Sequence, residues 1–208
     1  MNATTVALPF ALFASLAFVP IPQSTPPVSP APAPVVQGRD GAFTIDDVHS
    51  CALFRVQHFH AGQFWGRFNN IAGSFTLSQD PSKMAFDVSI ETDSVDSGNT
   101  KLDSHLKSPD FFNAKEFPTM VFKSTACTKN ADGTFALTGD LTIKGVTKSV
   151  NAVIEVTGWG FDMGRGARAG AEARFKINRS DFGVSYGVEN GALGNETTVI
   201  VGLEGTAV

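Results

Sequence analysis

The middle of the chain, Thr92 to Ser124, reads TDSVDSGNTKLDSHLKSPDFFNAKEFPTMVFKS. This stretch is rich in Asp, Ser and Phe and lacks the regular alternation of the segments on either side, so we interpret it as a connector between strands. Ser108-Pro109 predicts the start of a short helix, because serine caps free N–H groups and proline is tolerated at the first helical position. Phe111, Phe112 and Phe117 would then cover one end of a sheet, either as core aromatics or as the wall of a ligand pocket.

The segments around this connector alternate apolar and polar residues with a period of two, which is typical of strands with one wet face. Four such segments are 84–91, 150–157, 171–178 and 199–203. Turn signals separate the segments, and no long segment has helical periodicity. About eight strands at this spacing predict an all-β fold, either a closed barrel or a sandwich, and periodicity does not decide between them.

The first part of the chain differs in composition from the rest. Residues 1–38 contain no Asp, Glu, Lys or Arg, and an apolar run occupies 6–19. This run is shorter than the roughly 20 residues of a membrane-spanning helix, so we predict a signal peptide or an N-terminal membrane tether at 1–19. The segment 20–40 is rich in proline and predicts a disordered, semi-rigid linker. We therefore expect one folded domain at 41–208 and a periplasmic or secreted location.

Composition excludes some functions. The chain has 208 residues, 42% of them hydrophobic, and a net charge of −4 without any block of Lys or Arg, which argues against a nucleic-acid partner. Eighteen Phe stand against one Tyr, which predicts an apolar interior. Cys51 and Cys127 form either one disulfide or two free thiols, and the sequence leaves this open.

Histidines are the first candidates for chemistry. His58-x-His60 would place two imidazoles on one face of a strand, which is a weak indication of a metal site because a third ligand is needed. His58 also shares a face with Phe54 and Val56. It is therefore either the polar anchor at the end of an apolar ligand tunnel or a buried histidine that bonds a backbone carbonyl.

The connector carries the second group of polar candidates, Asp96, Asp103 and His105. These residues suit acid–base chemistry, but the sequence lacks the pattern of nucleophile, base and orienting group that an enzyme requires. We prefer the interpretation that they hold the connector by hydrogen bonds. Accordingly we expect no catalytic residues, no metal and no cofactor.

Two basic segments are interpreted as turns. Lys144 to Lys148 predicts a hairpin turn with solvated lysines. The glycine-rich segment that contains Arg165 and Arg168 predicts a flexible, solvated loop at the barrel rim. The alternative is that its arginines meet an anionic head group or a membrane surface.

Several motifs, taken together and in order, resemble the YceI-like family over residues 42–206. They are Phe43-x-Ile45-Asp46-x-x-His49-Ser50, Phe54-x-Val56-x-His58, Gly66-x-Phe68, Ser94-Val95-Asp96, Asp103-x-His105-Leu106-x-Ser108-x-x-Phe111-Phe112, Phe117-Pro118, Phe122-x-Ser124, Gly139 to Lys148, and Asp181-Phe182-Gly183.

The resemblance implies a single lipocalin-like antiparallel β-barrel with a short helical connector, which holds a long amphipathic lipid, polyisoprenoid or quinone-like, for carriage or storage. Transient membrane contact and a homodimer are further candidate interactions. The ligand-binding residues expected on this basis are Phe54, Val56, His58, Trp65, Phe68, Phe86, Phe111, Phe112, Phe122 and Phe175. Two alternatives stay open: a filled structural or stress-related barrel without ligand, and a metal-dependent enzyme that uses histidines.

Overall fold

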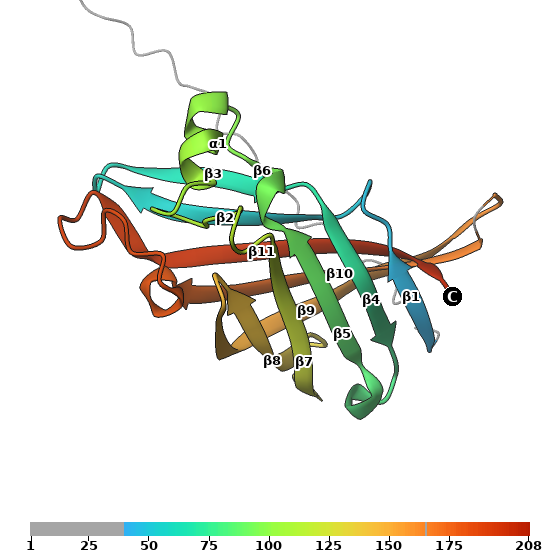
Figure 1. The fold of residues 1–208 in the computed structure, drawn as a ribbon. Coiled ribbons are helices and arrows are strands. Elements are labelled where there is room, and N and C mark those ends of the chain that lie inside the picture. Colours follow the sequence, from blue (N-terminus) through green and yellow to red (C-terminus); the bar gives the residue numbers. More distant parts are fainter. Residues whose placement is uncertain (1–39, 165) are drawn as a thin grey trace, which may run out of the picture. The chain divides into compact units, whose positions relative to one another are not determined.

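The computed structural model describes residues 40–164 and 166–208. This part of the chain forms eleven strands, one α-helix and three 3₁₀ turns (Figure 1). The predicted signal or tether segment, 1–19, and the linker as far as residue 39 lie outside the described residues. Within the described ranges, no helix is long and apolar enough to cross a membrane.

The elements follow one another in this order: β1 Gly41–Ile45, β2 Cys51–His58, β3 Gly62–Phe68, β4 Ile71–Leu77, η1 Pro81–Lys83, β5 Ala85–Glu91, η2 Thr92–Ser94, β6 Val95–Asp96, α1 Thr100–Leu106, β7 Thr119–Lys129, β8 Phe135–Ile143, β9 Val146–Asp162, β10 Gly166–Asn178, η3 Arg179–Phe182 and β11 Leu193–Ala207.

Eight of these strands close into an antiparallel barrel. Their order is β1-β4-β5-β7-β8-β9-β10-β11, and the pairing of β1 with β11 completes the ring. The other three strands extend from β11 in the order β2, β3, β6. The predicted all-β fold, a lipocalin-like barrel of about eight strands with a short helical connector, is therefore confirmed.

The long strand β11 pairs with two strands, β2 and β1, along one of its edges. Residues from Leu193 to Gly202 pair with β2, whereas Gly205 to Ala207 pair with β1. The barrel wall consequently divides, because β4 continues it from β1 and β3 continues it from β2. In Figure 1 the β2–β3 hairpin and β1 lie toward opposite ends of β11. One end of the barrel is thus closed by the pairing of β1 and β4 with the ring, whereas at the other end no strand pairing among the described residues joins β3 or β6 to the ring. We refer to this second end as the wide end.

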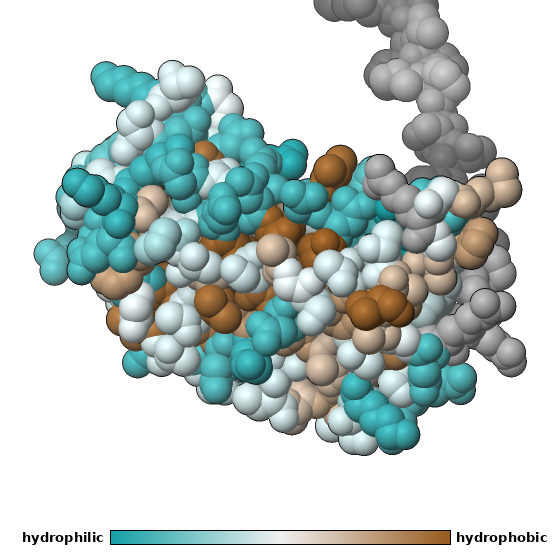
Figure 2. All heavy atoms as spheres, turned by 45° about the vertical axis from the view of Figure 1, so that its right-hand side comes forward, coloured by the Kyte–Doolittle hydropathy of each residue, from teal (hydrophilic) through white to brown (hydrophobic). Residues whose placement is uncertain are grey.

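Side chains alternate between the interior and solvent along the barrel strands, as the period of two predicts. In β8, for example, Leu137 and Leu141 are buried, whereas Ala136 and Asp140 are exposed. The face seen in Figure 2 is accordingly covered mostly by hydrophilic and intermediate residues, with hydrophobic ones in small separate groups.

The helix of the connector begins nearer the N-terminus than predicted, at Thr100 instead of at Ser108-Pro109. α1 begins after Asn99, whose side-chain oxygen accepts hydrogen bonds from two backbone amides of the first turn, each at 3.1 Å. Ser108-Pro109 follows the helix instead of starting it, because the residue before a proline disfavours helical backbone. The predicted helix start at this dipeptide is therefore wrong, and Phe111 and Phe112 lie in the turns after α1.

The two cysteines are free thiols. Cys51 lies in β2 and Cys127 in β7, and these strands are not neighbours in the sheet. Burial raises the pKa of the Cys127 thiol, and its Sγ lies 4.0 Å from Sδ of Met84. The structure therefore favours the free-thiol alternative.

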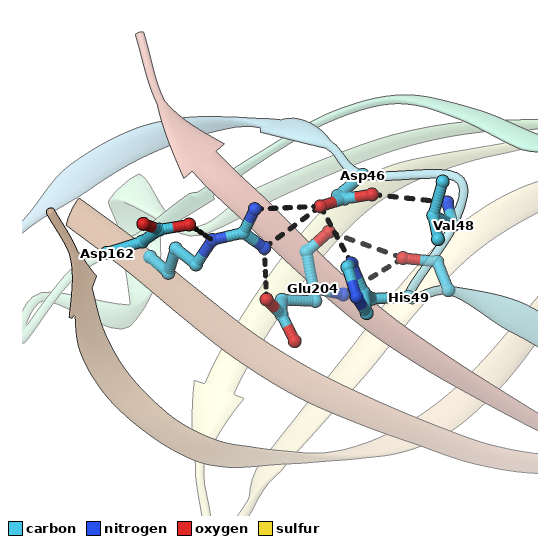
Figure 3. A network of polar contacts seen from close by, with 7 residues as sticks. Asp46, Val48, His49, Asp162 and Glu204 are labelled. Carbon is cyan, nitrogen blue, oxygen red and sulfur yellow. Dashed lines mark hydrogen bonds and ion pairs between the residues drawn. The ribbon is translucent and has the colours of Figure 1, made fainter. Parts of the chain in front are cut away.

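A polar network lies beside the seam where β1 meets β11. Asp46, which follows β1, accepts hydrogen bonds at 2.9 Å from both terminal nitrogens of Arg168 in β10. Arg168 also pairs with Glu204 in β11, and Nδ1 of His49 lies 2.9 Å from the Asp46 carboxylate. Figure 3 shows Asp46, His49 and Glu204 turned toward one another. The predicted solvated loop is wrong for Arg168, whose side chain is only 12% exposed.

The contacts of this network change the acidity of Asp46. Its hydrogen bonds with His49 and Arg168 lower the pKa of the carboxyl from 3.8 to about 2. Because the pKa is lower in the folded state, ionised Asp46 contributes stability above its unfolded pKa, and this contribution is lost as the pH falls through the folded value.

We expect Asp46→Asn to lower the free energy of unfolding at neutral pH by about 1–3 kcal/mol, because Arg168 loses a charged acceptor. The difference between the wild type and the variant should shrink as the pH falls from about 4 to about 2. Urea unfolding at a series of pH values measures both effects.

Asp87→Asn is the control for this experiment. Asp87 forms an exposed pair with Lys123 at 3.2 Å, and such pairs contribute less than about 1 kcal/mol. A difference between Asp46→Asn and the wild type that stays constant down to the lowest pH would contradict the assigned role of Asp46.

Candidate ligand-binding cavity

A cavity of about 880 Å³ lies inside the barrel, at the end where the wall divides. Its lining comes from β2, β3, β5 and β7 to β11, together with α1 and the turns that follow it. Most of the lining residues are Phe, Leu, Ile, Val or Ala. Ligand sites in proteins commonly have volumes of about 300–1,000 Å³ and predominantly apolar walls.

Nine of the ten residues expected to bind a ligand line this cavity. They are Phe54, Val56, His58, Phe68, Phe86, Phe111, Phe112, Phe122 and Phe175. The structure therefore brings together residues from five separate strands and the connector, and their role in binding stays a prediction.

Trp65 is the tenth residue, and the structure places it outside the cavity. Its side chain is 47% exposed, and the Arg55 guanidinium carbon lies 5.5 Å from the ring centroid. Side chains on a strand alternate between faces, so residues an odd number apart, such as Trp65 and Phe68, point to opposite sides. Phe64, which has the same parity as Phe68, lines the cavity instead.

Glycines make room for two of the aromatic rings in the wall. A Cβ atom on Gly66 would lie 2.3 Å from Cζ of Phe54, and one on Gly139 would lie 2.4 Å from Cζ of Phe122. The Phe54 ring also packs on Phe68, at 5.6 Å between centroids. Each glycine lacks a side chain, and the neighbouring ring occupies the space that a side chain would fill. The two rings therefore lie against the barrel wall.

The paired histidines do not share a strand face. β2 ends at His58, and the next two residues have positive φ angles, 47° at Phe59 and 53° at His60, so the chain turns. His58 is exposed at the cavity mouth and packs edge-on against Phe59 at 4.6 Å. The predicted alignment of His58 with His60 is therefore wrong, and so is the alternative of a buried His58.

The three polar residues of the connector act in two places. Asp103 accepts hydrogen bonds from the amide and hydroxyl of Ser97, at 2.7 and 2.6 Å, and Asp96 accepts one from the Gly98 amide at 2.8 Å. These bonds order the turn before α1, and the Gly98 amide is the main cause of the lowered pKa of Asp96.

His105 lies at the cavity and not in that turn. Its Nε2 is 3.0 Å from Asp110, and its ring packs on Phe111 and on Tyr186. Since Tyr186 lies in the segment between η3 and β11, these contacts join the connector to a second segment of the mouth.

Lys144 joins the same two segments. It lies in the turn between β8 and β9 with φ of 50°, and its Nζ donates hydrogen bonds to the carbonyls of Pro109 and Gly183, at 2.7 and 3.2 Å. The prediction of solvated lysines is therefore wrong for Lys144, which holds the connector and the segment after η3 together.

Arg179 is a cavity residue that sequence reasoning missed. It is 6% exposed and donates hydrogen bonds to the carbonyls of Val184, Tyr186, Leu193 and Gly194, at distances of 2.8–3.4 Å. Burial lowers the pKa of its guanidinium. The signal for this residue was its position four residues after Phe175, where it continues the inward parity of β10 just beyond the end of that strand.

Thr197 was missed as well. It is 6% exposed and lines the cavity, and its Oγ1 has no hydrogen-bond partner among the described residues. Its parity matches that of Val199 and Val201, which predicts an inward side chain.

Asp46, His49 and Glu204 have ligand atoms within 4.8 Å of one another, a spacing that a metal ion would fit. Arg168 already bonds to Asp46 and Glu204, so its cation fills the role that a metal ion would have there. The cluster therefore acts as an ion-pair network.

The chain is similar to known proteins in both sequence and structure. A model of the YceI-like domain matches residues 43–205. Protein YceI of Escherichia coli O6:H1 is 37% identical over 158 residues, which cover 76% of this chain and 81% of that protein.

Solved structures share the fold. BcnA of Burkholderia cenocepacia superposes with a TM-score of 0.70 at 20% identity, covering 78% of this chain and 99% of that one. A polyisoprenoid binding domain from Saccharophagus degradans, implicated in plant cell wall breakdown, superposes with a TM-score of 0.61 at 12% identity, covering 82% and 100%. Since the family model spans nearly the whole barrel, the chain belongs to the YceI-like domain family.

Proposed function

We propose that this protein binds a long amphipathic lipid, of the polyisoprenoid or quinone-like class, inside the barrel. The observation that carries this proposal is the apolar cavity of about 880 Å³. Every 100 Å² of lipid tail that leaves water contributes about 2.5 kcal/mol to binding. Binding needs no covalent step, so the protein acts as a carrier or store and not as an enzyme.

The relatives support this proposal. The Saccharophagus degradans domain of the same fold is described as polyisoprenoid binding. The apolar start of the chain and the proline-rich segment after it suit an exported protein that holds its lipid outside the cytoplasm. A barrel mouth that receives a lipid would meet a membrane transiently during loading.

The two alternatives have less support. A filled barrel would need inward side chains that leave no cavity, whereas this barrel encloses about 880 Å³. A histidine-based metal enzyme would need His58, His60 and His105 to converge on one ion. Instead, His58 packs against Phe59 at the end of β2, and His105 in α1 pairs with Asp110.

The full chain, purified from its own host without detergent, should carry a bound mass of several hundred daltons in native mass spectrometry. That mass should move into the organic phase on solvent extraction, and fragmentation should identify the chain. A protein that is uniformly free of lipid, also after incubation with a host lipid extract, would overturn the proposed function.

Filling the cavity should displace the lipid. Ala152 is buried in the lining on β9, whereas its neighbour Val153 is 47% exposed on the outer face. We therefore expect Ala152→Leu to reduce the lipid retained per protein several-fold and Val153→Leu to leave it unchanged, with native mass spectrometry as the measurement. Urea unfolding checks that both variants are folded, and equal retention by the two would contradict the assignment of the cavity.

A further inference from the structure

The charge balance of the cavity lining is uneven. Among the described residues that line it, Arg179 is the only one with a permanent charge, and none is Asp or Glu. A cation that faces an apolar cavity without an anion is costly, because a buried charge needs a compensating one. The positive charge of Arg179 is therefore not neutralised by any other residue of the lining, and an anionic ligand would neutralise it.

The protein does not neutralise Arg179 elsewhere. Its four hydrogen bonds go to backbone carbonyls, and within the described residues no carboxylate lies in salt-bridge range of it. Carbonyl dipoles satisfy N–H groups but carry no net charge. A guanidinium has five N–H groups, so one of them, on Nη1, is left without a protein acceptor in the described part of the chain.

Thr197 adds a second unsatisfied group in the same region. Its hydroxyl is buried in the lining without a partner among the residues described. Thr197 pairs with Ile177, which lies two residues before Arg179 on the neighbouring strand. The Arg179 guanidinium reaches the same stretch of β11, because its Nε donates a hydrogen bond to the carbonyl of Gly194, 2.8 Å away and three residues before Thr197. A buried hydroxyl and a guanidinium on the same stretch of the lining form a site for a group with several acceptor oxygens.

We infer that Arg179 and Thr197 form a head-group site and that the lipid held in the cavity is acidic, with a phosphate or carboxylate head. This inference rests on the proposed lipid binding. One oxygen of the head group accepts the free N–H of Nη1, and another accepts the Thr197 hydroxyl. Both bonds are charge-assisted. The polar anchor is then Arg179 with Thr197, and not His58, which is exposed at the mouth.

Lipids with the same tail and different heads separate the two proposals. The probes are geranylgeraniol, geranylgeranyl phosphate and geranylgeranoic acid, added to the delipidated full chain and measured by native mass spectrometry. We expect the phosphate or the acid to bind at least about tenfold more tightly than the alcohol, the effect of one charge-assisted hydrogen bond. Whichever of the phosphate and the carboxylic acid binds more tightly identifies the class of the head group.

Two threonine variants test the site without disturbing the fold. Thr197→Val removes an unpaired buried hydroxyl, so the stability should stay unchanged or rise, while the affinity for the acidic lipid falls about three- to tenfold. Thr92→Val is the matched control, because Thr92 is 1% exposed and its Oγ1 is also unpaired within the described ranges, but it does not line the cavity. It should leave the affinity for every probe unchanged.

Arg179→Met should remove the preference for acids and keep the binding of the alcohol, provided that the variant unfolds in urea as cooperatively as the wild type. If the wild type binds the three lipids equally, or if Thr197→Val and Thr92→Val bind the acid equally well, the head-group site is overturned while lipid binding stands. If none of the three lipids binds, the proposed function fails first.

Discussion

The structure depends on the backbone hydrogen bonds of one strand, β11. With fifteen residues at about 3.3 Å each, it is long enough to pair with β10 along one edge and with β1 and β2 in turn along the other. The seam with β1 consists of only three residue pairs, and the network of Asp46, Arg168 and Glu204 lies beside it. The pairing of β11 with β1 closes one end of the barrel, and its pairing with β2 instead of β1 leaves the other end wide.

A wide end exposes an apolar interior, and the chain covers it with turns instead of strands. Turns leave backbone carbonyls without strand partners, and these must be satisfied when they are shielded from water. Two cationic side chains meet this need. Lys144 donates hydrogen bonds to the carbonyls of Pro109 and Gly183. Arg179 donates to two carbonyls in the segment after η3 and to two at the start of β11. The mouth is therefore held in shape by cations, while its wall stays apolar.

Alternation with a period of two predicted the strands, because burial selects apolar side chains on one face. Nine of the ten wall residues that were expected with the help of the family resemblance line the cavity. The errors arose where this rule was not applied or does not hold. Trp65 was included against its parity with Phe68, and parity would also have found Arg179 and Thr197. His58 and His60 were paired across a strand end that propensity does not reveal. The partners of Arg168 are distant in sequence, so no local pattern predicts them.

A comparison of Arg168 with Arg179 shows how structural and functional charges differ. Arg168 lies near the start of β10, and its hydrogen bonds with Glu204 and Asp46 raise its pKa. Arg179 follows the end of the same strand, and burial lowers its pKa. Its hydrogen-bond partners among the described residues are backbone carbonyls. A cation that served the fold alone would gain from a carboxylate partner, as Arg168 does. Arg179 lines the cavity and has no carboxylate partner among the described residues, so the charge that balances it is the one that the proposed acidic lipid brings.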